Sequence, residues 1–280
     1  MGEHAKTFAP RRLPVISRWQ IEDLLSGRPS VSFDLEISST RVSYSGGRAS
    51  FVFGEGYEIS LDELPEGAEC EVYAYIDGRW VELSLAAGRF YKLCVFRRGW
   101  APTLMIDGIT MHSVLEDPLQ LTRRKVAYAE GDVLDCCTGL GYTAIEASKR
   151  AKRVVTVEAD PYVLELASYN PYSAGLAGVR IDVVVQDVTT FIQAVRNSAF
   201  SYVVHDPPRL SYATQQLYSE ALYAEYFRAL KRRGGLFHYT GATGSKYRGL
   251  DVARGVAERL RRVGFRVGKI ERGFGVFAVK

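Results

Sequence analysis

The second part of the chain alternates short apolar runs with amphipathic segments. Runs of four or five apolar residues recur with room for one helix between each pair. Such runs are typical of parallel strands that are covered on both faces. The pattern predicts strands at 133–136, 153–157, 182–186, 201–205 and 235–239, and helices at 143–150, 162–170, 189–197, 215–232 and 251–263.

Two further strand-like segments end the chain, at 266–271 and 275–280. Only Arg272-Gly273-Phe274 separates them, and so short a connection joins neighbouring strands that run antiparallel. The predicted fold class is therefore α/β, with a seven-stranded, mostly parallel sheet that closes on an antiparallel hairpin.

The first part of the chain follows a different pattern, with short strands joined by turns. Alternating apolar and polar residues flank Gly46-Gly47, Asp77-Gly78 and Asp107-Gly108. These dipeptides favour two-residue hairpin turns, because both central positions need a positive φ. We therefore predict a small antiparallel β-rich domain over residues 1–114, followed by a catalytic α/β domain over residues 115–280.

Composition and charge narrow the classes of protein. The formal charge of +4, from 36 Lys and Arg against 32 Asp and Glu, is too small by itself to indicate a nucleic-acid partner. No apolar run approaches the roughly 18 residues that span a membrane, and no charged-then-apolar leader opens the chain. The four cysteines show no CxxC spacing, so the sequence predicts buried free thiols, no metal site and a cytoplasmic location.

A glycine-containing loop follows the first predicted parallel strand, from Asp135 through Thr138 and Gly139 to Gly141. Glycines here permit a tight turn and a close backbone approach, so that a ligand can bind against the N-terminus of the next helix. A dinucleotide site needs a third glycine three residues after the second, where this chain has Ala144. Asp135 adds an acid that can engage the amino-acid part of a cofactor.

Two more acids follow the next two strands, Glu158 after 153–157 and Asp187 after 182–186. Glu158 can accept hydrogen bonds from both hydroxyls of a ribose, and Asp187 from an adenine amino group. Either acid alone is equally explained as a helix cap or a solvated carboxylate. Ligands of open α/β sheets bind at the carboxyl ends of the strands, so acids on successive ends favour one cofactor site.

The fourth predicted strand ends in His205-Asp206-Pro207-Pro208-Arg209. Consecutive prolines leave a strand as a stiff extended turn that donates no backbone N–H. The remaining groups are a carboxylate and carbonyls, which accept the two N–H donors of an exocyclic amino group and orient its nitrogen.

These motifs, in this order, resemble class I methyltransferases that modify exocyclic amino nitrogens of nucleobases. The resemblance covers about 132–280 and implies Asp206, Pro207 and Pro208 as catalytic residues. It also implies S-adenosyl-L-methionine as the cofactor. The residues expected to bind it are Asp135, Cys136, Thr138, Gly139, Gly141, Tyr142, Thr143, Glu158, Ala159, Asp187 and Val188.

The whole chain resembles a predicted archaeal methyltransferase family with the same His-Asp-Pro-Pro-Arg motif. That resemblance implies methylation of ribosomal or transfer RNA, with cytosine N4 favoured. Amino methyltransferases commonly have an aromatic residue after the prolines, where this chain has Arg209; a guanidinium can also stack on a base or hold a phosphate. Substrate-binding residues are predicted at Arg209, Tyr212, Lys246 and Arg248, with the β-rich domain extending the basic surface.

Two other functions stay open at this point. An aminopropyltransferase acting on polyamines also places hairpins before such a domain, and residues 104–111 resemble its hairpin. A polyamine site needs several carboxylates, whereas here one acid is followed by prolines and Arg209. A non-catalytic RNA-binding protein that retains the fold is the other alternative. His205 and His238 end strands at the predicted site and are either structural or general bases.

Overall fold

The computed structural model describes residues 5–67, 69–241, 251–271 and 273–280. The chain groups into two compact units. Unit 1 comprises Met1–Thr7, Thr122–Pro161 and Leu176–Lys280, and unit 2 comprises Phe8–Leu121 and Tyr162–Gly175. This grouping differs from the predicted division after residue 114, because Tyr162–Gly175 belongs with the N-terminal half.

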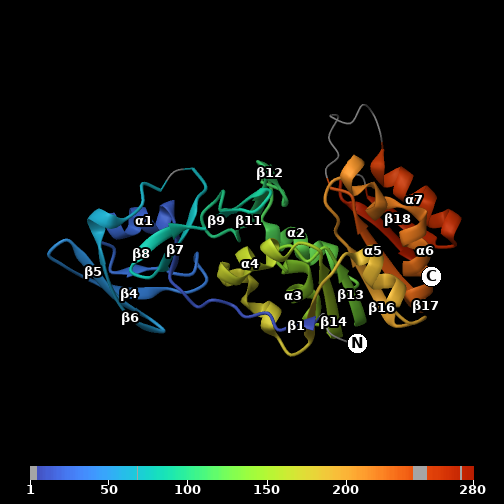
Figure 1. Ribbon diagram of the computed structural model, residues 1–280, viewed down its shortest axis with the longest axis horizontal. Coiled ribbons are helices and arrows are strands. Elements are labelled where there is room, and N and C mark those ends of the chain that lie inside the picture. The colour runs from blue at the N-terminus through green and yellow to red at the C-terminus, as the bar shows by residue number, and fades with distance from the viewer. Residues whose placement is uncertain (1–4, 68, 242–250, 272) are drawn as a thin grey trace. The chain divides into compact units, whose positions relative to one another are not determined.

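Unit 1 is built on an eight-stranded sheet with the order β1-β15-β14-β13-β16-β17-β19-β18 (Figure 1). Five strands are parallel, and β18 and β19 form an antiparallel hairpin at one edge. The two-residue β1 adds antiparallel to β15 at the other edge. The strands are β1 (Ala5–Lys6), β13 (Gly131–Cys136), β14 (Ala151–Glu158), β15 (Ile181–Val185), β16 (Phe200–His205), β17 (Leu230–Tyr239), β18 (Arg266–Glu271) and β19 (Gly275–Val279).

The predicted fold class is therefore confirmed: seven of these strands make a mostly parallel sheet of an α/β fold that closes on an antiparallel C-terminal hairpin. The helical segments of the second part of the chain are α2 (Pro118–Lys125), α3 (Tyr142–Ser148), α4 (Pro161–Tyr169), η2 (Pro171–Ala177), α5 (Val188–Phe191), η3 (Ile192–Ala194), η4 (Tyr212–Tyr218), α6 (Glu220–Ala229) and α7 (Val252–Val263). Of these, α4 after its first residue and most of η2 group with unit 2. Apolar residues of α6 and α7, among them Tyr226 and Leu260, pack with Leu134, Val203 and Leu236 of the strands in one core.

Two predicted helices were wrong in extent. The predicted helix 215–232 divides, because the Ser219 side chain accepts a hydrogen bond from Leu222 N and caps α6. Leu230 then already pairs with Phe200, so the residues after it belong to β17 rather than to the helix. In place of the predicted helix 189–197, the α-helix α5 ends at Phe191 and the short 3₁₀ segment η3 follows from Ile192 to Ala194.

Among its described residues, unit 2 contains three small antiparallel sheets and, besides α4, a helix that the sequence pattern did not reveal, α1 (Arg18–Leu25). All three predicted hairpins are confirmed, with positive φ at both central residues of each turn. The elements are β2 (Val15–Ser17), β3 (Ser30–Val31), β4 (Thr40–Ser45), β5 (Arg48–Phe53), β6 (Glu55–Ser60), η1 (Leu61–Glu63), β7 (Val72–Ile76), β8 (Arg79–Glu82), β9 (Ser84–Ala86), β10 (Phe90–Cys94), β11 (Thr103–Ile106) and β12 (Ile109–Thr110).

The prediction of four free thiols was wrong for one pair. Cys70 and Cys94 form a disulfide in unit 2, whereas Cys136 and Cys137 are free. The backbone explains the pairing, since Glu71 and Cys94 form an antiparallel bridge that brings the two cysteines together. The cysteines therefore no longer support a cytoplasmic location, which stays a prediction. In the part of the chain that the structure describes, no helix has both the length and the apolar character to cross a membrane.

The hairpin edge of the sheet leaves no room for a side chain at Gly275. A Cβ there would lie 2.5 Å from the His238 carbonyl oxygen and 2.7 Å from the Phe237 ring. Because a paired backbone oxygen cannot move away, we expect Gly275→Ala to destabilise the protein by about 2 kcal/mol, which is roughly 5 °C in melting temperature. At Gly268 of β18 the nearest atom to such a Cβ is 3.9 Å away. Thermal unfolding of Gly268→Ala is the control, and equal melting temperatures for the two variants would contradict the prediction.

Candidate functional site

The carboxyl ends of three neighbouring strands bring the predicted site residues to one edge of the unit 1 sheet. Cys136 of β13 pairs with Val157 of β14 and with His205 of β16, so the segments that follow these strands begin side by side. The Asp206 backbone N–H donates to the Cys136 carbonyl oxygen at 3.3 Å. The glycine-containing loop and the Asp-Pro-Pro segment are thus joined by a direct hydrogen bond.

The loop after β13 is held by its backbone. Cys137 N and Thr138 N both donate to the Val157 carbonyl oxygen, at 2.9 and 3.2 Å. Cys137, Gly139 and Gly141 all have positive φ. At Gly141 a Cβ would lie 2.5 Å from the Leu176 side chain, so packing requires glycine there. At Gly139 the nearest atom to such a Cβ is 4.0 Å away, so the space beside this backbone is open.

Glu158 faces this loop from the end of β14. Its Oε2 accepts a hydrogen bond from Gly139 N at 2.9 Å, and its Oε1 accepts one from Asp160 N at 3.1 Å. The side chain is buried, and burial raises the pKa of its carboxyl. The structure therefore brings Gly139 and Glu158 together, as the sequence predicted.

Asp135 is the most deeply buried acid of the site, with no exposed surface. Its Oδ2 accepts a hydrogen bond from Thr156 Oγ1 at 2.7 Å, and Thr156 Oγ1 also lies 2.6 Å from Thr138 Oγ1. Its Oδ1 is buried and has no hydrogen-bond partner among the described residues. Burial raises the pKa of Asp135 to about 7; the side chains of Thr156 and Thr143 oppose this rise, and the nearby charge of Asp206 adds to it. An unpartnered buried acceptor of this kind is a place for a cationic donor.

Asp206 is paired with a residue that the sequence analysis did not single out. Lys125, the last residue of α2, places Nζ 2.7 Å from Asp206 Oδ2. The Lys125 side chain is 4% exposed and that of Asp206 18%. The same Nζ lies 3.7 Å from the centroid of the Tyr239 ring. The basic run 123–125 was the sequence signal, but it did not distinguish Lys125 from its exposed neighbours.

The other predicted cofactor residues are placed less clearly. Asp187 is exposed, and its Oδ1 accepts from Thr189 N at 2.7 Å and from Thr189 Oγ1 at 2.5 Å, so it caps α5. Cys136 Sγ faces the core, 3.2 Å from the Tyr226 hydroxyl oxygen. Burial is complete or nearly so for Tyr142, Thr143 and Val188, whereas Ala159 is exposed. The cofactor roles of all these residues stay predictions.

The predicted substrate residues lie after β16. Pro207 is buried, whereas Pro208, Arg209 and Tyr212 are exposed, Tyr212 to 91%. The Tyr218 hydroxyl donates to the Pro208 carbonyl oxygen at 2.8 Å and holds the end of the proline turn. Lys246 and Arg248, also predicted to bind substrate, lie outside the described residues.

Both histidines of this edge are fully buried behind the site. His205 Nε2 lies 2.8 Å from the Leu217 carbonyl oxygen, which fixes the proton on Nε2 and leaves Nδ1 as acceptor for Tyr226, 2.9 Å away. Burial lowers the pKa of His205 to about 4, and burial together with the neighbouring His205 lowers the pKa of His238 well below its ordinary range. These contacts favour a structural role for His205, and the burial of His238, whose Nδ1 lies 3.0 Å from the Tyr239 carbonyl oxygen, favours the same role for that ring.

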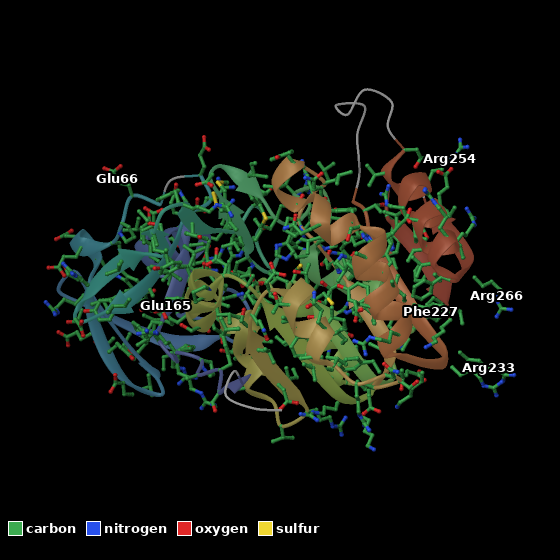
Figure 2. The ribbon with its side chains drawn as sticks, turned by 45° about the vertical axis from the view of Figure 1, so that its right-hand side comes forward. Glu66, Glu165, Phe227, Arg233, Arg254 and Arg266 are labelled. Atoms are coloured by element: carbon green, nitrogen blue, oxygen red, sulfur yellow. A yellow bond between two sulfur atoms is a disulfide. The ribbon has the colours of Figure 1, made fainter. Side chains whose placement is uncertain are left out.

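The formal charges of the two units have opposite sign. Unit 1 contains 25 Lys and Arg against 15 Asp and Glu, and unit 2 contains 11 against 17. Figure 2 shows Arg233, Arg254 and Arg266 projecting from unit 1, and Glu66 and Glu165 on unit 2. The expected extension of a basic surface over the β-rich domain is therefore not supported by its charge.

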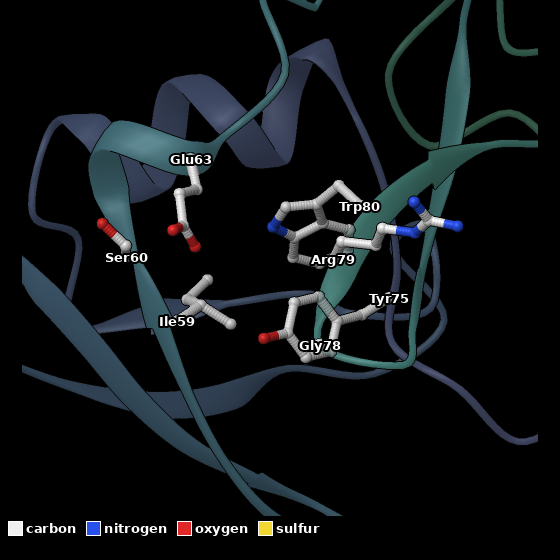
Figure 3. Close-up of a pocket in the computed structure, with 7 residues that line it drawn as sticks. All are labelled: Ile59, Ser60, Glu63, Tyr75, Gly78, Arg79 and Trp80. Atoms are coloured by element: carbon white, nitrogen blue, oxygen red, sulfur yellow. The ribbon is translucent and has the colours of Figure 1, made fainter.

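Unit 2 has a hollow of its own, about 220 Å³ in volume (Figure 3). The rings of Tyr75 and Trp80, with centroids 5.0 Å apart, and the carboxylate of Glu63 line it. The buried Trp80 Nε1 has no hydrogen-bond partner among the described residues. None of the motifs for a cofactor lies here. In the described part of the chain, no His, Cys, Asp and Glu side chains cluster so as to hold a metal ion.

Comparison with known proteins shows which family this chain belongs to. Over 236 residues the chain is 44% identical to the protein described as "Uncharacterized protein MJ1233" from Methanocaldococcus jannaschii. The match covers 81% of this chain and 80% of that protein. This chain belongs to the MJ1233 family. Residues 110–238 also match a family described as "Conserved hypothetical protein 95", so the match includes the whole run from β13 to β16 and most of β17.

Solved structures agree with the fold at low sequence identity. A spermidine synthase in complex with the transition state analogue AdoDATO superposes with a TM-score of 0.54 at 17% identity and covers 70% of each chain. Spermidine synthase from Thermotoga maritima gives 0.53 at 17% identity, over 72% of this chain and 74% of that one. At 17% identity, this likeness shows only that the protein shares the fold of these structures.

Proposed function

We propose that this protein is an S-adenosylmethionine-dependent methyltransferase that modifies an exocyclic amino nitrogen of a nucleobase in structural RNA, with cytosine N4 favoured. The observation that carries the proposal is the direct joining of two strand ends. Asp206-Pro207-Pro208 follows β16, and its first residue is hydrogen-bonded to Cys136 beside the glycine-containing loop. Acceptors for an amino group thus stand next to the residues suited to the cofactor.

The residues present fit S-adenosylmethionine. The buried, unpartnered Oδ1 of Asp135 is an acceptor for the ammonium of its amino-acid part. The open space beside Gly139 admits a ligand against the backbone, and Glu158 faces that space with a carboxylate suited to ribose hydroxyls. When bound there, S-adenosylmethionine supplies an electrophilic methyl group on a sulfonium.

The chain's own groups then bind and orient the substrate nitrogen. Asp206 and the Pro207 carbonyl accept its hydrogens, and the bond from Tyr218 to the Pro208 carbonyl keeps the turn in place. Once methylated, an exocyclic amine loses its proton readily, so the site needs no strong base. The burial of both histidines agrees with this. The excess of Lys and Arg on unit 1 favours RNA as the carrier of the base.

The likeness to spermidine synthases gives weight to aminopropyl transfer as the second candidate. The pairing of Asp206 with Lys125 argues against it, because a buried ammonium already neutralises this carboxylate. A polyamine would bring further positive charge beside that ammonium and would be repelled. A neutral amino group of a base meets no such repulsion.

The test is the nucleoside content of RNA from a strain that lacks the gene. Ribosomal and transfer RNA, digested to nucleosides and analysed by mass spectrometry, should lose a methylated amino nucleoside that the wild-type gene restores and an Asp206→Asn gene does not. An unchanged set of methylated nucleosides, with a changed polyamine pool, would favour the second candidate. Restoration by the Asp206→Asn gene would favour a non-catalytic RNA-binding protein.

Cofactor affinity should depend on pH through Asp135. Because its raised pKa is about 7, the carboxyl is protonated below that pH and cannot hold an ammonium as a charged acceptor. We expect the affinity for S-adenosylmethionine to fall roughly tenfold between pH 8 and pH 6, following the ionised fraction. Titration calorimetry across this range measures it. Asp135→Asn should bind weakly with little dependence on pH, and a parallel decline in that variant would assign the effect to another group.

A further inference from the structure

We propose that Lys125 is the positioning residue of the methyl-transfer site. Its ammonium holds one oxygen of the Asp206 carboxylate, which leaves the other oxygen to receive an amino hydrogen of the substrate. The inference rests on the proposed function, which did not assign a part in the reaction to Lys125.

The geometry fixes the ammonium from two sides. Nζ donates to Asp206 Oδ2 at 2.7 Å and lies 3.7 Å from the Tyr239 ring centroid. Tyr239 is the last residue of β17, the strand next to β16. A cation over an aromatic face is held electrostatically, so the ammonium does not simply follow the carboxylate. The carboxylate is therefore oriented by a group that is itself anchored on two elements.

Stability alone is a poor explanation for this pair. Removing an ammonium and a carboxylate from water costs about as much as their attraction returns, so a buried pair adds little net stability. The chain has a second Lys–Asp pair for comparison, in which Lys231 Nζ lies 2.6 Å from Asp132 Oδ2. That pair is 43% and 31% exposed, and Asp132 lies at the start of β13, away from the predicted site. Its lysine provides a matched control.

Several groups besides Lys125 face Asp206. Asp135 on β13 and the Cys137 thiol in the following loop lie within electrostatic reach of its carboxylate. Tyr239 on β17 lies under the ammonium, and His205, the preceding residue, is turned into the core and neutral. Lys125 therefore balances the charge of Asp206 beside a second acid. Without its ammonium, the charged carboxylate of Asp206 would lie beside Asp135 with no cation to balance it.

The first experiment measures pH profiles. Wild type, Lys125→Met, Lys125→Arg and Lys231→Met transfer tritiated methyl groups from S-adenosylmethionine to RNA from the deletion strain, from pH 5 to pH 9. We expect Lys125→Met to reduce kcat about tenfold or more at pH 7, with KM for S-adenosylmethionine within about threefold of wild type. At saturating S-adenosylmethionine, which removes the pH dependence of cofactor binding through Asp135, its acidic limb should move up by about one pH unit or more. Lys125→Arg should keep the wild-type limb, and Lys231→Met should match wild type throughout.

An acidic limb that stays in place in Lys125→Met, or moves equally in Lys231→Met, would overturn the proposal.

The second experiment reads the pair without any activity. If the carboxyl stays protonated in the folded variant at a pH where it is ionised in the unfolded chain, the folded state binds one more proton. The free energy of unfolding then falls as pH rises. The melting temperature of Lys125→Met, relative to wild type, should therefore fall as the pH rises from about 3 to about 6, across the ordinary range of a carboxyl. The double variant Lys125→Met/Asp206→Asn should show no such fall. If wild type transfers no methyl group but these melting curves follow the expectation, the proposed function fails while the coupling of Lys125 to Asp206 stands. No difference between the single and double variants would overturn the coupling itself.

Discussion

Replacing Asp206 should abolish methyl transfer while leaving cofactor affinity within about threefold of wild type, because the proposed function assigns its carboxylate to the substrate nitrogen and not to the cofactor. Loss of one acceptor whose bond strengthens in the transition state costs about 2 to 4 kcal/mol, or roughly 10² to 10³ in kcat. Asp206→Ala makes this change, but it also leaves the buried ammonium of Lys125 without its counter-ion. Asp206→Asn also removes the counter-ion, but it keeps the size of the side chain and an acceptor oxygen for Lys125, and is the sharper variant.

Controls separate chemistry from folding in this prediction. Asp132→Asn removes the same kind of charge from the pair with Lys231, at the other end of β13. Single-turnover rates measure the chemical step, and titration calorimetry measures binding of S-adenosylmethionine. Both Asp206 variants should bind the cofactor and fail in transfer, whereas Asp132→Asn should bind the cofactor and transfer methyl groups as wild type does. Turnover at the wild-type rate in Asp206→Asn would move the catalytic assignment to another residue.

Local sequence signals were sufficient for most elements of the fold. Two-residue turns such as Gly46-Gly47 and Asp77-Gly78 have the positive φ values that their residues favour, so their hairpins could be predicted from neighbours in sequence. Apolar runs predicted the parallel strands for the same reason. The helix 215–232 was overextended because its apolar period continues into β17. Only the pairing of Leu230 with Phe200 reveals the strand, and pairing is not a local property.

The residues of the candidate site also fall into those that local sequence predicts and those that depend on distant contacts. The loop and the acids on successive strands could be predicted because parallel strands bring their carboxyl ends to one edge. The role of Lys125 could not be predicted, because it contacts Asp206 across 81 residues of sequence. It also belongs to a run of three basic residues, and nothing in the sequence distinguishes it from the other two. The disulfide between Cys70 and Cys94 was missed for a similar reason, since it depends on a bridge between non-adjacent segments.

Neither the sequence nor the structure assigns a role in cofactor binding to Asp187. The sequence allowed either an adenine-binding acid or a helix cap, and the structure shows the cap contacts with Thr189. A capping carboxylate still has a second oxygen, so these contacts do not assign its part in cofactor binding. Its role stays a prediction that binding data for Asp187→Asn can decide.

RNA binding should depend on salt through unit 1 rather than through unit 2. Unit 1 has ten more basic than acidic residues and unit 2 has six fewer, and phosphates are bound by the positive surface. Arg123 and Arg209 are exposed on unit 1, near Lys125 and Asp206 in the chain. Arg41 and Arg79 are exposed on unit 2 and give a matched change of charge.

We expect the double variant Arg123→Gln/Arg209→Gln to lower the slope of log affinity against log salt by about 1.4 to 1.8, since each lost phosphate contact removes about 0.7 to 0.9. At physiological salt this corresponds to a loss of affinity of roughly tenfold or more. Arg41→Gln/Arg79→Gln should leave the slope unchanged.

Point variants are preferable to removing the N-terminal half, because the α4 segment belongs to unit 2 and Arg11 N donates to the Ser168 carbonyl oxygen there. Filter binding of deletion-strain RNA between 50 and 200 mM salt, a range over which such slopes are measurable, provides the comparison. Equal reductions in the two double variants would mean that unit 2 contacts phosphates despite its acidic charge, and a slope lowered only in the unit 2 variant would reverse the assignment.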